Sequence, residues 1–534
     1  MTDISPAQAS PTVTADQGWN PRSGQPVGGP VPHTTTDELD RLATAAAAAG
    51  PELAALAGRA DRLRAVAAAL EAAREELVAV ADEETALGPT RLGSELTRAR
   101  VQLEMFADAV DEGSFLDVVI DRPDPDARPA PRPDLRRMMV PIGPVAVYAA
   151  SNFPFAFSVA GGDTASALAA GCPVLVKAHP GHPQTSVQSG RVIATALREH
   201  GAPDGTFAVV HGFEAGRDLV RHPAIRAAGF TGSLAGGRAL FDLAQSRPDP
   251  IPFYGELGSL NPTVVTPGAL AARPQEIVAG FVGSYLLGAG QFCTKPGLLF
   301  LPEGHGLDHA LAQAVAGTAV HPLLGERIHD GYGLGVAALV DEPDVRAVVP
   351  PAASRAGGPA GAGFAVAPTL FAVSAAAFVR RLDWSGSPAR RTMRGPLLEE
   401  CFGPTALIVE YASTGELLAA LDAVPGSLTT TLHGEPDAEP ELVRALLERA
   451  AGLAGRVVWS SWPTGVAVTA AQHHGGPWPA TTAALHTSVG TAAMRRFLRP
   501  VAYQAVPDAL LPEALRDDNP LGLPRRVTDP RADS

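Results

Sequence analysis

Cysteine is scarce in this sequence, with three residues in 534. Cys172, Cys293 and Cys401 are too few and too widely separated for a disulfide framework, and they lack the spacing of a structural zinc site. We therefore expect reduced thiols in a cytoplasmic protein, and no metal site built on cysteine.

Basic residues and long apolar runs are also in short supply. The chain has 42 Lys and Arg against 56 Asp and Glu, for a formal net charge of −14. A nucleic-acid or anionic-membrane partner needs a basic face, so this balance argues against both. No apolar stretch approaches the roughly 20 residues of a membrane span, and the first residues lack the pattern of a signal peptide. The composition predicts a soluble protein, but it says little about which small molecule might bind.

The N-terminal third begins with a polar stretch and continues in helical patterns. Residues 1–33 are rich in Pro, Gly, Ser and Thr, so we expect a flexible N-terminus over 1–35. The capping-box spacing from Thr35 to Glu38 predicts the start of a helix, and Gly50-Pro51 predicts its end. Apolar residues at helical spacing predict further helices, over about 63–77 and 94–110.

The pattern then changes to strands alternating with helices. An arm or long hairpin of strands is predicted from β-prone runs at 118–120, 137–140 and 145–148. A parallel α/β sheet covered on both faces is indicated by apolar strands separated by helices, at 174–177, 206–210 and 227–230. A second region of mixed helices and short strands spans about 260–470. The chain is therefore expected to be an α/β protein.

The cysteine with the most suggestive surroundings is Cys293, in Gly288-Ala289-Gly290-Gln291-Phe292-Cys293-Thr294. Glycines before a thiol permit close backbone approach, and a helix starting nearby would stabilise a thiolate through its N–H groups. A single cysteine is nevertheless more often a small buried apolar residue. Cys172, at the start of a buried strand, and Cys401 fit that structural role.

Two polar residues follow predicted strands. Glu256 comes after the apolar run 251–254, where a desolvated carboxyl group can act as a general base; the alternative is a solvated surface glutamate. Asn152 comes after the run 145–148 and either caps the next helix or donates a hydrogen bond to a developing oxyanion. Residue chemistry alone leaves both pairs of alternatives open.

One glycine-rich turn has the setting of a phosphate-binding site. Residues 232–237 follow the predicted strand 227–230 and open a helix, where a pyrophosphate can meet the helix N-terminus. This turn is not the G-x-G-x-x-G fingerprint. Residues 333–338 match that fingerprint loosely but follow no convincing strand, so we interpret them as a decoy.

Together these motifs resemble the aldehyde dehydrogenase superfamily, over about residues 35–520. Each motif is weak alone, but six of them occur in the family's order: Ser151-Asn152-Phe153-Pro154, Val176-Lys177, Phe230-Thr231-Gly232-Ser233, Glu256-Leu257-Gly258, Gly290-Gln291-Phe292-Cys293 and Glu400-Cys401-Phe402-Gly403-Pro404.

The resemblance implies the aldehyde dehydrogenase fold, with its parts assigned by residue range. We expect a Rossmann-like cofactor domain (36–115 and 145–256), an α/β catalytic domain (257–470) and a β-strand oligomerisation arm (116–144 and 484–510). Strands of such an arm extend a partner's sheet, so the resemblance implies a homodimer or homotetramer.

The resemblance also implies a mechanism. Cys293 attacks the aldehyde carbon, and the Asn152 amide and the Cys293 backbone N–H hold the oxyanion. Glu256 activates the water that hydrolyses the resulting thioester, and it is a candidate for deprotonating the thiol. Relatives that pass the acyl group to coenzyme A lack this glutamate, so a carboxylic acid is the expected product.

Cofactor residues follow in the same way. Lys177 matches the lysine on the adenosine ribose, Ser233 with Gly232 and Gly237 matches the pyrophosphate turn, Glu400 matches the glutamate on the nicotinamide ribose, and Phe402 lies against the nicotinamide. NAD-preferring relatives carry a glutamate three residues after the lysine, but Pro180 stands there in this sequence. We therefore predict NADP as cofactor, with NAD also accepted, and with His179 or Arg217 near the 2′-phosphate.

Finer resemblance points to one branch, the α-ketoglutarate semialdehyde (2,5-dioxovalerate) dehydrogenases, with NADP-dependent long-chain fatty aldehyde dehydrogenases as the alternative. Lys295 is a candidate partner for the far carboxylate of such a substrate, although a solvated or structural lysine is the favoured interpretation. The turn 473–476 is expected to line the substrate entrance, with no metal there. A catalytically silent homologue is a weaker alternative, because Cys293, Glu256 and Asn152 are all present.

Overall fold

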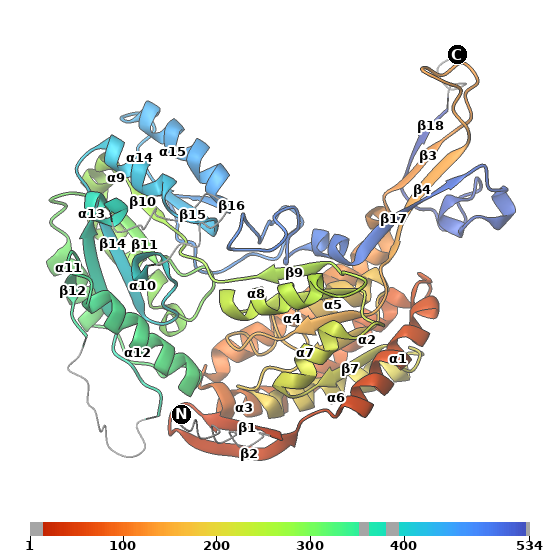
Figure 1. Ribbon diagram of the computed structural model, residues 1–534, viewed down its shortest axis with the longest axis horizontal. Coiled ribbons are helices and arrows are strands. Elements are labelled where there is room, and N and C mark those ends of the chain that lie inside the picture. The colour runs from red at the N-terminus through yellow and green to blue at the C-terminus, as the bar shows by residue number, and fades with distance from the viewer. Residues whose placement is uncertain (1–13, 352–362, 381–394, 530–534) are drawn as a thin grey trace, which may run out of the picture.

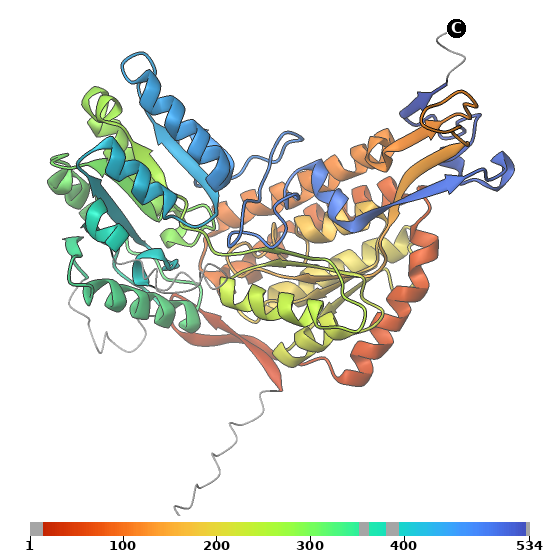
Figure 2. The same ribbon diagram turned by 45° about the horizontal axis from the view of Figure 1, so that its top comes forward.

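The computed structural model describes residues 14–351, 363–380 and 395–529. Two α/β lobes lie side by side, and a narrow arm of strands projects from one of them (Figure 1). A hairpin at the N-terminus lies along the bottom of the molecule in this view. Turning the molecule keeps the lobes and the arm distinct (Figure 2).

The first lobe contains a five-stranded sheet in which every pair is parallel and the order is β7-β6-β5-β8-β9. Its strands are β5 (Val145–Tyr148), β6 (Val174–Lys177), β7 (Phe207–Val210), β8 (Ala227–Thr231) and β9 (Phe253–Glu256). The strand order reverses between the adjacent strands β5 and β8, and ligands bind at such switch points in open parallel sheets. The predicted parallel sheet is confirmed.

Helices cover both faces of this sheet because alternate strand residues point to opposite sides. Val145, Val147 and Val176 pack toward α2, α4, α5 and α6, whereas Ala146 and Leu175 pack toward α1, α7 and α8. The helices are α1 (Thr36–Leu53), α2 (Arg59–Ala72), α3 (Arg74–Thr85), α4 (Pro89–Glu112), α5 (Gly162–Ala170), α6 (Pro183–Glu199), α7 (Phe213–Arg221) and α8 (Leu234–Gln245).

The N-terminal segment is more ordered than the sequence predicts. Strands β1 (Ala15–Asn20) and β2 (Gln25–Pro32) form an antiparallel hairpin, so the prediction of a flexible segment is wrong for these residues. Polar contacts hold the hairpin: the buried Asp16 carboxylate accepts from the backbone N–H of Gly212 and bonds to the His33 ring. Composition gives no sign of such long-range polar contacts.

The predicted helix start is confirmed, with Thr35 as the N-cap of α1: its Oγ1 accepts from the N–H of Glu38 at 3.3 Å. The predicted helix end at Gly50-Pro51 is wrong, since α1 continues to Leu53. The buried side chain of Leu53 holds this last turn in the core. The guanidinium of Arg59 also donates to the carbonyl oxygens of Leu53 and of the next two residues, which replaces missing helix hydrogen bonds.

The second lobe contains a seven-stranded sheet of order β12-β13-β14-β11-β10-β15-β16, in which only β12 is antiparallel to its neighbour among the described strands. The strands are β10 (Thr263–Val265), β11 (Leu298–Pro302), β12 (Arg346–Val349), β13 (Thr369–Ser374), β14 (Thr405–Tyr411), β15 (Ser427–His433) and β16 (Ala454–Trp459).

Two apolar layers cover this second sheet. Helices α9, α10 and α11 pack on one face, and α12 to α15 pack on the other. The helices are α9 (Pro267–Ala272), α10 (Pro274–Tyr285), α11 (Asp308–Ala316), α12 (Glu326–Val340), α13 (Ala375–Arg380), α14 (Thr414–Asp422) and α15 (Pro440–Leu453). The glycine-rich decoy at 333–338 lies inside α12, not at a strand-to-helix turn.

The arm is a four-stranded sheet of order β17-β4-β3-β18 (Figure 1). Its strands are β3 (Val118–Asp121), β4 (Leu135–Pro141), β17 (Leu498–Gln504) and β18 (Arg525–Thr528). The predicted strands at 118–120 and 137–140 are confirmed. The run 145–148, predicted for the same arm, is instead β5 of the parallel sheet, and β18 lies outside the residues predicted for the arm. None of the described helices is long and apolar enough to cross a membrane.

Candidate active site

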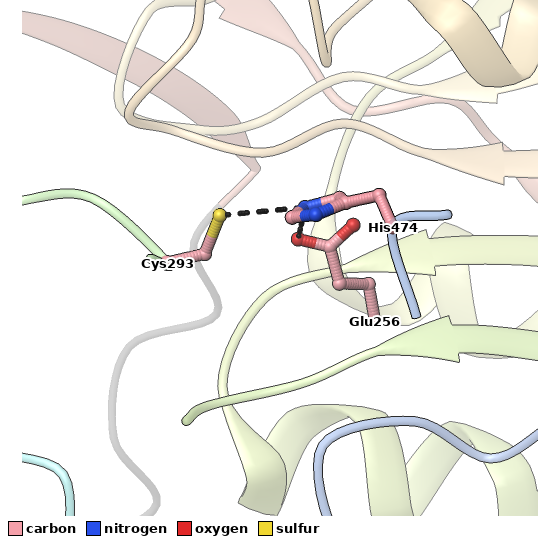
Figure 3. Close-up of side chains that lie close together, drawn as sticks. All are labelled: Glu256, Cys293 and His474. Carbon is pink, nitrogen blue, oxygen red and sulfur yellow. Dashed lines mark hydrogen bonds and ion pairs between the residues drawn. The ribbon is translucent and has the colours of Figure 1, made fainter. Parts of the chain in front are cut away.

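Three chemically reactive side chains converge where the two lobes meet (Figure 3). Glu256 is the last residue of β9, Cys293 lies in the turn after the short 3-10 helix Leu287–Gly290, and His474 lies in the long loop after β16. The Cys293 Sγ is 3.7 Å from the His474 Nε2, which is 2.9 Å from the Glu256 Oε1. Glu256 and His474 are buried.

The backbone around Cys293 is held by close contacts. Gly290 has φ of +69°, and a Cβ added there would lie 2.1 Å from the carbonyl oxygen of Gly403. Only glycine fits such an approach. The side-chain amide of Asn261 donates to the carbonyl oxygens of Cys293, at 2.7 Å, and of Lys295, at 2.9 Å. The glycines before the thiol therefore act as predicted, but no helix starts at Cys293 in the described chain: a short 3-10 helix, Leu287–Gly290, ends before it.

The electrostatics of the cluster favour an ionised carboxylate beside a neutral thiol. Burial alone would raise the pKa of Glu256, but the His474 ring and the hydroxyl of Ser488 hold that pKa below its usual value. Burial and the negative charge of Glu256 raise the pKa of the Cys293 thiol well above its ordinary value. The thiol therefore needs a base at the moment it attacks.

The hydrogen bonds of His474 identify its role. One nitrogen, Nε2, faces both the Glu256 carboxylate and the thiol, while Nδ1 is buried with no hydrogen-bond partner among the described residues. An ionised carboxylate accepts hydrogen bonds only, so Nε2 carries the proton and donates it. In this tautomer the Nε2–H of His474 donates to the Glu256 carboxylate and lies beside the Cys293 sulfur.

Asn152 lies against the segment that carries the thiol. Its side-chain amide donates to the carbonyl oxygen of Gln291, 2.9 Å away and two residues before Cys293. The next helix, α5, begins at Gly162, so the helix-cap alternative for Asn152 is wrong. Arg91 donates to the carbonyl oxygen of Asn152 at 2.8 Å and lies over the ring of Phe292, which fixes this loop against the thiol segment.

The glycine turn at 232–237 lies at a strand-to-helix junction, as predicted. Ser233 caps α8, its Oγ accepting from the N–H of Gly236 at 3.2 Å, while Gly232 and Ser233 remain exposed. A Cβ added to the buried Gly237 would lie 2.1 Å from the side chain of Leu257, so glycine lets α8 approach the segment after Glu256. This exposed helix N-terminus fits an anionic pyrophosphate.

Glu400 also fits a cofactor site. Its carboxylate is buried, and Oε1 has no hydrogen-bond partner in the described part of the chain. Burial raises the pKa of this carboxyl group to about 7. A buried oxygen without a partner is costly, and a sugar hydroxyl group would satisfy it. Phe402, two residues further on, is partly buried.

Lys177 ends β6, and its aliphatic chain contacts the turn of Gly216. Burial lowers the pKa of Lys177, and the carboxylate of Asp16 on the N-terminal hairpin opposes this shift. The carboxylate of Asp16 therefore lies near Lys177, although the two residues are 161 positions apart in the sequence. Lys177 therefore has no acid beside it in the local sequence, which favours NADP, but it has the Asp16 carboxylate nearby in the folded chain.

The two residues predicted near the 2′-phosphate, His179 and Arg217, differ in whether they can offer a positive charge to an anion. His179 accepts a hydrogen bond at Nδ1 from the N–H of Gly181, and burial lowers the pKa of His179 well below its usual value. Its ring is therefore a neutral part of a turn. Arg217 on α7 has a 40% exposed side chain that pairs loosely with Glu214 at 3.4 Å, so its charge can reach an anion.

Lys295 has the structural role that the sequence favoured. It is buried, and its ammonium group donates to the carbonyl oxygens of Cys401 at 2.6 Å and of Gly403 and Thr405 at 3.0 Å. All three of its protons are engaged, so it cannot bind a substrate carboxylate. Burial raises the thiol pKa of Cys172 and of Cys401 to about 11, which agrees with structural roles for both.

Sequence reasoning missed several residues of the site. The 473–476 turn was expected only to line the entrance, but His474 contacts both Glu256 and Cys293. Because His473 stands next to it, residue type alone could not have shown which of the two histidines contacts the thiol. The pair of consecutive histidines before two glycines was the available signal.

A model of the aldehyde dehydrogenase family matches residues 13–344, and the chain belongs to this family. It is 44% identical over 521 residues to alpha-ketoglutaric semialdehyde dehydrogenase 2 of Azospirillum brasilense, covering 95% of each chain. It is 40% identical over 530 residues to alpha-ketoglutaric semialdehyde dehydrogenase of Acinetobacter baylyi (strain ATCC 33305 / BD413 / ADP1), covering 98% of this chain and 96% of that one.

Solved structures show the same fold at lower identity. A mutant of aldehyde dehydrogenase C from Pseudomonas syringae, in complex with NAD+ and octanal, aligns with a TM-score of 0.73 at 20% identity, over 93% of this chain and 94% of that one. 1-Pyrroline-5-carboxylate dehydrogenase from Thermus, with bound NAD, aligns with a TM-score of 0.73 at 22% identity, over 92% and 89%. The predicted aldehyde dehydrogenase fold is confirmed.

Proposed function

We propose that this protein oxidises an aldehyde to a carboxylic acid through a thioester on Cys293, and that its preferred substrate is 2,5-dioxopentanoate, which gives 2-oxoglutarate. The observation that carries the mechanism is the cluster of a thiol, an imidazole and a buried carboxylate within hydrogen-bonding distance. The names of the two relatives at 40–44% identity over nearly the whole chain support the substrate.

The first half of the reaction forms a bond between sulfur and carbon. Glu256 takes the proton of the Cys293 thiol as the sulfur attacks the aldehyde carbon, and the Nε2–H of His474 stabilises the charge that develops. The carbonyl oxygen becomes an oxyanion. The Asn152 amide, released from the Gln291 carbonyl, and the backbone N–H of Cys293 donate to it.

The cofactor fits the residues that face this site. Lys177 and the exposed start of α8 would hold the adenosine ribose and the pyrophosphate, and Glu400 would accept from the second ribose. When bound, the nicotinamide ring supplies the acceptor for the hydride that leaves the substrate carbon. Collapse of the oxyanion then leaves an acyl group on Cys293.

The second half of the reaction hydrolyses the thioester. Glu256 first releases the thiol proton to solvent, then accepts a proton from water as the water attacks the acyl carbon, and passes this proton to sulfur as the carbon–sulfur bond breaks, which returns the thiol. The lowered pKa of Glu256 keeps it ionised near neutral pH, so it is ready as a base in both halves. The released product is the carboxylate.

For the cofactor we propose NADP, with NAD also accepted. Pro180 stands where a glutamate would exclude the 2′-phosphate, and the exposed Arg217 side chain supplies a cation nearby. The negative charge of the Asp16 carboxylate weakens this preference, although the carboxylate interacts with His33 and His211 as well as with Lys177. We also propose a cytoplasmic homodimer or homotetramer assembled through the arm.

The test is the formation of NADPH and NADH from 2,5-dioxopentanoate, pentanal and decanal by the wild-type enzyme and Cys293→Ala. The proposal expects the highest kcat/KM for 2,5-dioxopentanoate with NADP, and no turnover by Cys293→Ala. A preference for decanal would retain the mechanism but replace the substrate with a long-chain fatty aldehyde. Turnover by Cys293→Ala would refute the mechanism.

A further inference from the structure

Helix α4 is docked against the loop that carries Asn152. The buried carboxylate of Glu95 accepts from the backbone N–H groups of Phe155, at 2.7 Å, and Ala156, at 3.0 Å. Charge-assisted hydrogen bonds of this kind fix one face of the helix next to the oxyanion loop. A side chain one turn along this face is therefore directed at the substrate side of the active site.

Arg98 is that side chain. Its guanidinium lies over the ring of Phe157, 5.3 Å from the centroid, and the Phe157 ring lies 6.4 Å from the ring of His474. Its Nε and Nη2 atoms are buried and have no hydrogen-bond partner among the described residues. Arg100, two positions further on, instead pairs with Glu104 at 2.6 Å on the outer surface.

The other arginines close to the site are already engaged. Arg91 donates to the carbonyl oxygen of Asn152 and lies between aromatic rings. Arg456 donates to the carbonyl oxygens of Pro463 and Gly465. Arg91 and Arg456 each keep one buried nitrogen without a partner, Nη1 and Nε respectively, whereas Arg98 keeps two and its guanidinium donates no hydrogen bond to any described residue.

The electrostatics of Arg98 agree with a position beside the reacting groups. Burial lowers the pKa of Arg98, whereas Glu95, Cys293 and Glu256 oppose the shift when they carry negative charge. An arginine remains protonated in such surroundings. Burying its N–H groups without acceptors costs free energy, and a carboxylate ligand would remove that cost through two parallel hydrogen bonds.

We propose that Arg98 binds the far carboxylate of an ω-oxo acid whose aldehyde group is attacked by Cys293. This inference rests on the proposed function and names the residue that makes the enzyme prefer an oxo acid to a simple aldehyde. A five-carbon chain places its two ends about 5 Å apart when extended. The Arg98 guanidinium lies over the Phe157 ring, which neighbours the His474 ring beside the thiol, so it can meet the far end of such a ligand.

The experiment compares 2,5-dioxopentanoate with pentanal, which has the same chain length and no carboxylate. Arg98→Gln should lower kcat/KM for 2,5-dioxopentanoate on the order of 10- to 100-fold, mainly through KM, because a hydrogen bond to a charged group is lost. Pentanal oxidation should fall by a much smaller factor, because it loses only the effect of the Arg98 charge on Cys293, and the activity that remains shows that the variant is folded. Arg100→Gln, with the same change of charge on the same helix, should alter neither substrate.

A second measurement does not depend on the identity of the substrate. Glutarate should inhibit pentanal oxidation by the wild-type enzyme, and Arg98→Gln should weaken this inhibition by a similar factor. An equal loss for both substrates would make Arg98 a structural residue, and no loss for either, or no inhibition by glutarate, would place the carboxylate elsewhere. A wild-type preference for pentanal over 2,5-dioxopentanoate would instead count against the proposed substrate.

Discussion

Replacing His474 by phenylalanine isolates the hydrogen bond that holds the catalytic base. Phenylalanine keeps a ring of similar size next to Phe157 but removes the Nε2–H that lies 2.9 Å from Glu256 and 3.7 Å from the Cys293 sulfur. A hydrogen bond to a charged group contributes about 1.5–3 kcal/mol. We therefore expect kcat/KM to fall by roughly 10- to 150-fold.

The pH dependence of the activity tests more specifically whether His474 sets the ionisation of Glu256. The His474 ring lowers the pKa of Glu256, so the wild-type enzyme should keep its activity as the pH falls toward the usual carboxyl range. In the variant, burial is opposed mainly by the Ser488 hydroxyl, so the pKa of Glu256 should rise. Because the ionised form is the base, activity should then be lost at higher pH than in the wild-type enzyme.

The assay is a pH profile of kcat/KM for both enzymes, with melting temperatures measured alongside to confirm that the variant is folded. Ser488→Ala removes only the second hydrogen bond to Glu256, so its profile should lie between the other two. If His474→Phe lowered the rate equally at every pH, the role assigned to His474 in setting the state of Glu256 would be refuted.

Three further predictions test neighbouring parts of the account. Glu256→Gln removes the general base, so kcat should fall by roughly 10²- to 10⁴-fold, while cofactor binding measured by fluorescence quenching should be unchanged; weakened binding would contradict this role. Asp16→Asn removes the negative charge near Lys177, so the Kd for NADP should fall relative to that for NAD in titration calorimetry, and an unchanged ratio would mean that the carboxylate does not sense the 2′-phosphate. Lys295→Met leaves three buried carbonyl oxygens without a donor, so the free energy of unfolding in urea should fall by about 3 kcal/mol with no shift in substrate preference; a selective loss of oxo-acid oxidation would instead give Lys295 a role in substrate binding.

The sequence predicted the parts of the fold that depend on local patterns. Apolar runs located β6 and β8, and the glycine turn after β8 was placed at a helix N-terminus, because each of these signals lies within a few residues. Pro51 misled the prediction, since the C-terminal turn of α1 is held by Arg59. The N-terminal hairpin was missed for a related reason, because its buried Asp16 is satisfied by residues some 200 positions away in the sequence.

The residues of the candidate site likewise fall into those with a local sequence signal and those without one. Cys293, Glu256 and Asn152 were identified because their local sequences resemble those of a known family. His474 and Arg98 carry no such local signal: the first is one of two adjacent histidines, and the second is one of several arginines on a long helix. Only the packing of the His474 loop and of α4 around the thiol separates them from their neighbours. Whether Asn152 donates to an oxyanion remains a prediction.

The acyl intermediate on Cys293 is the central step of the proposed mechanism. The decisive measurement is mass spectrometry of peptides from enzyme quenched with acid during the first turnover of 2,5-dioxopentanoate and NADP. The account predicts the acyl group of the substrate on the peptide that contains Cys293, and none in Cys293→Ala, which should still bind the cofactor. An acyl group on Cys401 or Cys172, or reduction of the cofactor by Cys293→Ala, would contradict it.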